Sequence, residues 1–136
     1  MRLSSISILL CLLAAGPAAY SQQNSYTFAL DSLDSHLMMT LRTLTPVPCL
    51  GTSIRNQVQW GEDTIAVILA GFIRPTPCLD GVEPASSLIS LGRQIKATFY
   101  LRIREEGSDD LWSVSRTRAG FQLTPIHRSF TSYLIK

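Results

Sequence analysis

Residues that commonly carry chemistry are scarce in this sequence. Its 136 residues include three cysteines and two histidines, and the formal net charge is only +2. His36 and His127 are not spaced like metal ligands relative to a cysteine, and zinc usually needs four ligands. No Gly-x-Ser-x-Gly motif marks a serine nucleophile. The balanced charge argues against a nucleic-acid partner. The sequence therefore predicts no catalytic residue, no metal and no cofactor.

The N-terminus has the pattern of a secretory signal peptide. Arg2 precedes an apolar run from residue 6 to residue 15, and small residues follow up to Ser21. The apolar run is shorter than the roughly 20 residues that span a bilayer, so a retained anchor is the less favoured alternative. We expect cleavage after Ser21, or alternatively after Ala19. The predicted location is therefore secreted or periplasmic, with membrane contact only through the cleaved signal.

Cleavage of the signal would remove Cys11 and leave Cys49 and Cys78. An even pair in an exported protein predicts a disulfide, and two free or metal-binding thiols are the alternative. The two cysteines have similar surroundings, Thr-Pro-Val-Pro-Cys-Leu at 45–50 and Arg-Pro-Thr-Pro-Cys-Leu at 74–79. We expect each to be extended and outside a helix. The bridge would close a loop of about 30 residues, worth about 3–4 kcal/mol on the chain-entropy model.

Alternation of apolar and polar residues predicts strands over most of the chain. Residues 53–60 and 64–73 should form a hairpin, with the second strand apolar enough to be buried on both faces. Two shorter strands are expected at 120–124 and 130–135. Residues 36–44 fit either a strand or one face of a helix, and their threonines favour the strand.

The clearest alternation begins at residue 95 and predicts a second hairpin. The register we expect places Ile103 opposite Trp112 and Leu101 opposite Val114, with all four on one face. The polar segment 105–110 would be the connecting loop. Its four acids suit calcium, but the alternating Asp-x-Asp spacing of calcium loops is absent. A solvated turn is therefore the favoured interpretation.

The expected organisation is a signal peptide at 1–21, an N-terminal lead at 22–35 and a single domain at 36–136. That domain has signals for seven or eight short strands, with turn residues at short intervals. This pattern is typical of immunoglobulin-like sandwiches. The predicted fold class is all-β, an immunoglobulin-like antiparallel β-sandwich of about seven or eight short strands with one disulfide.

Features between Ile65 and Leu123 also point to a group of proteins. An apolar strand ends at Gly71, a proline-rich loop holds Cys78, and the strand Phe99-Tyr100-Leu101-Arg102-Ile103 precedes a polar hairpin. This arrangement resembles small secreted immunoglobulin-like β-sandwich proteins of Gram-negative bacteria. Such proteins mostly act as adhesion, assembly or binding modules. The resemblance therefore implies a sandwich fold and a binding role, although fold alone does not fix function.

The segments around the two cysteines are the candidate binding loops. Rigid loops lose little entropy on docking, so they suit recognition of another protein. The residues that we expect to form this surface are Pro46, Pro48, Leu50, Pro75, Pro77 and Leu79. The predicted function is a non-enzymatic interaction or adhesion domain that binds a protein partner through loops or a strand edge. The alternatives are an extracellular protease inhibitor with a disulfide-braced loop and, ranked last, a small hydrolase with a histidine base.

Overall fold

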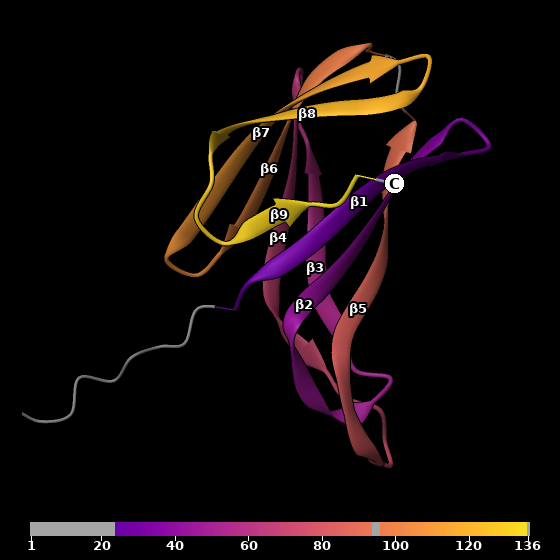
Figure 1. The fold of residues 1–136 in the computed structure, drawn as a ribbon, viewed down its shortest axis with the longest axis vertical. Coiled ribbons are helices and arrows are strands. Elements are labelled where there is room, and N and C mark those ends of the chain that lie inside the picture. The colour runs from indigo at the N-terminus through magenta and orange to yellow at the C-terminus, as the bar shows by residue number, and fades with distance from the viewer. Residues whose placement is uncertain (1–23, 94–95, 136) are drawn as a thin grey trace, which may run out of the picture.

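The computed structural model describes residues 24–93 and 96–135, which form two β-sheets packed on each other (Figure 1). The all-β sandwich with one disulfide is confirmed, and the part of the chain that the structure describes contains no helix that could span a membrane. The strands are β1 (Tyr26–Leu33), β2 (His36–Leu50), β3 (Ser53–Trp60), β4 (Thr64–Ile73), β5 (Leu79–Arg93), β6 (Thr98–Glu105), β7 (Ser108–Thr117), β8 (Gly120–His127) and β9 (Thr131–Tyr133).

The strands are divided between sheet A, in the order β5-β2-β1-β9, and sheet B, in the order β3-β4-β6-β7-β8. Neighbouring strands are antiparallel except in the pairs β4–β6 and β1–β9, which are parallel. These two pairs depart from the expected antiparallel pattern because the chain crosses to the other sheet before each pair is completed. β2 and β5 are also longer than the short strands expected, at 15 residues each.

The N-terminal boundary expected from the sequence is wrong. Residues 26–33, assigned to a lead segment, form β1, which pairs along its whole length with β2. Tyr26, Phe28 and Leu30 alternate along this strand and are buried in the core. Their alternation is a strand signal of only a few residues, too short to fix a boundary by itself. The strand interpretation of residues 36–44 is confirmed, since they lie within β2.

The first expected hairpin is present as β3 and β4. β4, however, is not buried on both faces as expected. Ile65, Val67 and Leu69 are buried, while Ala66 and Ile68 on the other face are only half-buried. The reason is that sheet A covers one face of sheet B and leaves the other face towards solvent.

The second hairpin, β6–β7, is present, but its expected register is wrong by two positions. Leu101, and not Ile103, lies opposite Trp112. Gly107 has a φ of 78°, a conformation that glycine adopts without a steric penalty, and it allows a turn so short that residues 109–110 belong to β7. A shift by an even number of positions keeps each side chain on its face. The residues expected in the core are therefore buried despite the error.

The two sides of the sandwich differ. On one side the edge strands β3 and β5 approach each other and are joined by side chains. The Ser87 hydroxyl accepts from the Ile54 N–H at 2.8 Å and donates to the Ile54 carbonyl at 3.0 Å. The Trp60 indole N–H donates to the Leu91 carbonyl at 2.9 Å. On the other side, the edges are β8 and the three-residue strand β9.

Candidate functional site

A disulfide links Cys49 at the end of β2 to Cys78, just before β5. The end of β2 and the start of β5 lie at the lower end of the molecule in Figure 1. The expected pairing is confirmed. Cys49 is buried and Cys78 is exposed. Cys49 is not extended as expected, because its φ is 72° where the chain turns from β2 into β3. Gly51, two residues later, also has a positive φ of 78°.

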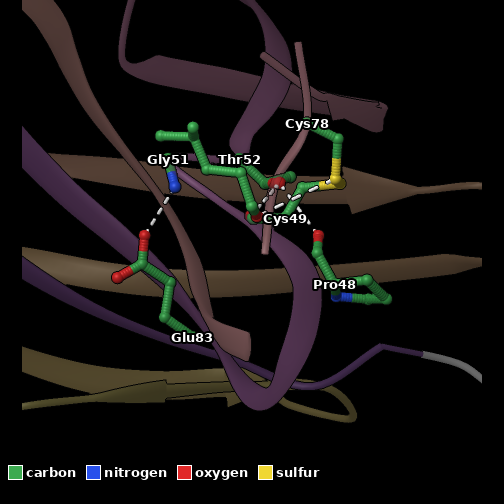
Figure 2. The surroundings of a disulfide bond; sticks show 7 residues. Pro48, Cys49, Gly51, Thr52, Cys78 and Glu83 are labelled. Carbon is green, nitrogen blue, oxygen red and sulfur yellow. Dashed lines mark hydrogen bonds between the residues drawn. A yellow bond between two sulfur atoms is a disulfide. The ribbon is translucent and has the colours of Figure 1, made fainter. Parts of the chain in front are cut away.

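Hydrogen bonds brace the same turn (Figure 2). The Thr52 hydroxyl donates to the carbonyl oxygens of Cys49 and Pro48, at 2.7 and 3.2 Å. The Gly51 N–H donates to the Glu83 carboxylate at 2.6 Å, which ties the turn to β5. Each such bond contributes about 0.5–1.5 kcal/mol net, and more when one partner is charged. Together with the disulfide they hold the turn and the start of β5 in one arrangement.

An apolar surface, here called the tip face, covers the paired ends of β2 and β5. Its members lie opposite one another in three pairs, and a register shift separates the first two pairs from the third. The pairs are Pro46 with Pro84, Pro48 with Val82, and Leu50 with Leu79. Val82 is 70% exposed and Leu79 is 56% exposed. Val47, on the opposite face of β2, packs against the core instead.

Four of the six predicted binding residues therefore belong to the tip face, namely Pro46, Pro48, Leu50 and Leu79. Pro75 lies beside Gly51, with its Cγ 3.9 Å from the position of a Cβ on that glycine. Pro77 is exposed in the connection before Cys78. The structure thus gathers all six around one disulfide.

Val82 and Pro84 are members of the tip face that the sequence did not predict. Residues 74–90 show little periodicity, so the pairing of this segment with β2 had no sequence signal. The irregular register of β2 with β5, which shifts at several points, explains the missing period. Gly81 allows the close approach of β5 to Leu50 of β2, because a Cβ on this residue would lie 2.7 Å from Leu50 Cδ2.

The histidines lie away from the tip face. His36 Nδ1 is 3.0 Å from the Asp34 carbonyl oxygen, and His127 Nδ1 is 2.9 Å from the Asp109 carbonyl oxygen. Both side chains are exposed, and neither contact is the carboxylate or hydroxyl partner that a histidine base would need. Within residues 24–93 and 96–135, no group of three or more His, Cys, Asp or Glu residues is arranged to hold a metal ion.

Three of the four acids of the second hairpin have partners among the described residues. Asp109 forms ion pairs with Arg102 at 3.4 Å and Arg104 at 3.5 Å. Glu105 accepts a hydrogen bond at 2.7 Å from the hydroxyl of buried Tyr26. Burial, followed by the hydrogen bond and charge of Glu105, raises the pKa of that tyrosine. The acids therefore join strands to one another and do not form an open carboxylate cluster.

Asp110 is a fully buried carboxylate that fixes the crossover from β8 to β9. It accepts hydrogen bonds from Ser129, Phe130 and Thr131, five in all, at 2.6–3.1 Å. Burial by itself would raise the pKa of Asp110. The bonds from Thr131, Ser129 and Phe130 together outweigh it and hold the pKa below its usual value.

Comparisons with protein-family models, with curated proteins and with solved structures found no match to this chain. The disulfide is compatible with a protein that folds outside the reducing cytoplasm.

Proposed function

We propose that this chain is an exported, non-enzymatic interaction domain that binds another protein through the tip face. The observation that carries the proposal is the combination of exposed apolar side chains with a braced backbone. Leu79 and Val82 are more than half exposed, and they lie beside a turn held by the disulfide and the Glu83 carboxylate. Exposed apolar side chains that cluster on a monomer commonly mark an interaction site.

The bracing strengthens the proposal because binding normally orders flexible groups at a cost of about 0.5–1.5 kcal/mol for each immobilised side chain. Prolines have no rotamer entropy of this kind to lose. Pro46, Pro48 and Pro84 contribute half of the tip face, and the disulfide restricts the backbone on both sides of it. The tip face therefore loses little conformational entropy when it binds a partner.

Export is part of the proposal, and it rests on the signal-peptide pattern of residues 1–21, which lie outside the described residues, together with the disulfide. Its test is mass spectrometry of the protein recovered from the periplasm and medium of a Gram-negative expression host. We expect an N-terminus at Gln22 and no free thiol. Recovery of unprocessed chain from the cytoplasm would contradict export.

The binding site is tested by photo-cross-linking in cells that carry the protein. A photoreactive residue replaces Val82 on the tip face or, as the control, exposed Gln57 on β3. We expect discrete adducts from the Val82 position only, and their loss when Leu79→Asp is added to the same chain. Equal adducts from both positions, or adducts that survive Leu79→Asp, would contradict binding through the tip face.

One observation favours protease inhibition as a second candidate. The connection of residues 74–78 is short, exposed over most of its length and tied at Cys78 to Cys49. A constrained exposed loop is the geometry that suits a protease cleft. An inhibitor should titrate a secreted protease with one-to-one stoichiometry, and reduction of the disulfide should weaken the inhibition. Absence of inhibition across the major classes of secreted protease would exclude this candidate.

A further inference from the structure

The side of the sandwich opposite the β3–β5 contact is open. A cavity of about 610 Å³ lies there between residues 30–32 of β1, residues 116–121 of the β7–β8 hairpin, and Tyr133 and Ile135 after the final crossover. Its volume is within the range of ligand-binding clefts. In Figure 1 the C-terminal segment after β9 runs beside β1. We call this cavity the side groove.

One strand edge at the side groove lacks a neighbouring strand among the described residues. β8 is the last strand of sheet B and pairs only with β7. An unpaired edge presents backbone N–H and C=O groups that can accept another strand. β8 also contains Pro125, a residue that sheets tolerate at an edge.

At the side groove, a residue that faces the space between the sheets is charged, whereas such residues elsewhere on β7 include core side chains. Arg116 has the same strand parity as the buried residues Trp112 and Val114, so it points towards the space between the sheets. Phe121 of β8 lies opposite Arg116. Arg116 is nevertheless exposed, and its backbone N–H donates to the Ala97 carbonyl at 2.7 Å, just before β6 begins.

The side groove carries an excess of positive charge. Arg116 and Arg118 line it together with one acid, Asp31. Within residues 24–93 and 96–135, the ion pairs are those of Arg102 and Arg104 with Asp109, so neither groove arginine is paired there. A guanidinium prefers a planar carboxylate partner, which it can bind through two parallel hydrogen bonds.

We propose that the side groove binds an extended peptide segment of a partner protein. The segment adds a strand to the free edge of β8. It places an acidic side chain at Arg116 and Arg118 and apolar side chains against Phe121 and Tyr133. The backbone edge supplies affinity, and the alternating side-chain positions supply specificity, as in other cases of strand addition. A free strand edge favours a peptide over a small apolar acid, which could use the arginines but not the edge.

This site lies on the long side of the sandwich and is independent of the tip face. Its test begins with a displayed library of random linear peptides selected on the purified protein. Affinities of enriched peptides are then measured by fluorescence anisotropy on the native chain and on Arg116→Glu/Arg118→Glu. Arg55→Glu, at an exposed arginine on β3, is the matched charge control, and Leu79→Asp is the tip-face control.

We expect enriched peptides to contain an acidic residue among alternating apolar ones. The double groove variant should weaken binding at least about tenfold, which is 1.4 kcal/mol, while both controls bind normally. A peptide with lysine in place of its acid should recover affinity for the double groove variant. Methylation of central backbone amides in the peptide should abolish binding, and amide exchange at residues 120–123 should slow in the complex.

Four results would overturn the proposal. The first is enriched peptides whose affinity is unchanged by Arg116→Glu/Arg118→Glu. The second is binding that tolerates methylation of every backbone amide in the peptide, since strand addition depends on those groups. The third is arginine-dependent binding of dodecanoate without binding of any peptide, which would assign the side groove to an amphipathic small anion. Loss of peptide binding in Leu79→Asp alone would move the peptide site to the tip face.

Discussion

Replacing Asp110 by asparagine removes the charge that holds the β8–β9 crossover. One carboxylate oxygen accepts from the N–H and hydroxyl of Ser129, and the other accepts from the N–H groups of Phe130 and Thr131 and from the Thr131 hydroxyl. Asparagine keeps one acceptor oxygen and turns an amide N–H₂ towards the remaining donors. At least two of these donors then face another donor, and those of Phe130 and Thr131 are buried.

Hydrogen bonds to a charged group contribute about 1.5–3 kcal/mol each, and a buried donor left without an acceptor costs about 1–3 kcal/mol. Partial relaxation of the hydroxyls lowers the total, so we expect Asp110→Asn to destabilise the domain by about 3–5 kcal/mol near neutral pH. That is a large part of the roughly 5–15 kcal/mol available to a small domain. The loss should be visible as a lower urea midpoint, followed by the fluorescence of buried Trp112, which donates to Thr131.

The effect should also depend on pH, with a sign fixed by the lowered pKa of Asp110. The unfolded chain has an ordinary aspartate pKa near 3.9, so around this pH it binds more protons than the folded state does. The contribution of Asp110 is therefore complete above about pH 4 and is lost as the pH falls through the folded-state pKa. The stability difference between the native chain and Asp110→Asn should shrink at acid pH.

The neighbouring acid is the control. Asp109 is partly exposed and paired with arginines on the surface, so Asp109→Asn should cost no more than about 1 kcal/mol. An Asp110→Asn variant that is no less stable than Asp109→Asn, or one whose deficit stays constant through the acid range, would refute the reasoning.

Three further changes test the bracing. Cys49→Ser/Cys78→Ser should cost about 2–4 kcal/mol in urea unfolding, and reductant should destabilise the native chain but not this variant. Ser87→Ala removes the hydroxyl that bonds both backbone groups of Ile54, and we expect about 1–3 kcal/mol lower stability in thermal unfolding, whereas no loss would mean that water replaces it. Gly81→Ala introduces a Cβ at a φ of 143° and 2.7 Å from a neighbouring leucine, so hydrogen exchange in the tip face should accelerate; unchanged exchange would contradict the tight contact.

Alternation along the chain was sufficient to predict which faces of the central strands are buried. The sequence predicts Leu101, Ile103, Trp112 and Val114 on one face, and all four are buried although the predicted hairpin register is wrong. Alternation depends only on local geometry, so it survives an even shift in pairing. The exact register depends on the length of the turn. The polar residues 105–110 do not indicate that the turn contains only two residues.

Pairing between distant segments was not predictable in the same way. The partnership of β2 with β5 is interrupted by irregularities, and prolines at residues 46, 48 and 84 remove backbone donors from it. Because of these features, the segment lacks the alternation of apolar and polar residues that predicts a long strand. The candidate binding residues near Cys49 were predicted from the two cysteines. Val82 was not predicted, because it lies next to no cysteine or other sequence signal.

On the inner face of β7, the roles of two polar residues can be told apart only from their surroundings in the structure. Asp110 and Arg116 lie on the same side of this strand as Trp112 and Val114, and in the sequence both simply interrupt an apolar pattern. Their surroundings separate them. The five donors around Asp110 come from residues 19 to 21 positions away and satisfy it inside the domain.

Arg116 lies at the opposite end of β7, beside the side groove, and no acid of the described residues is paired with it. Burying a charged side chain without an internal partner would cost desolvation free energy that nothing offsets. Arg116 is instead exposed at the cavity, close to the edge of β8, which pairs only with β7 among the described strands. An arginine without an acidic partner and a strand edge without a neighbouring strand thus lie at one groove. Both features favour an acidic partner in an extended conformation.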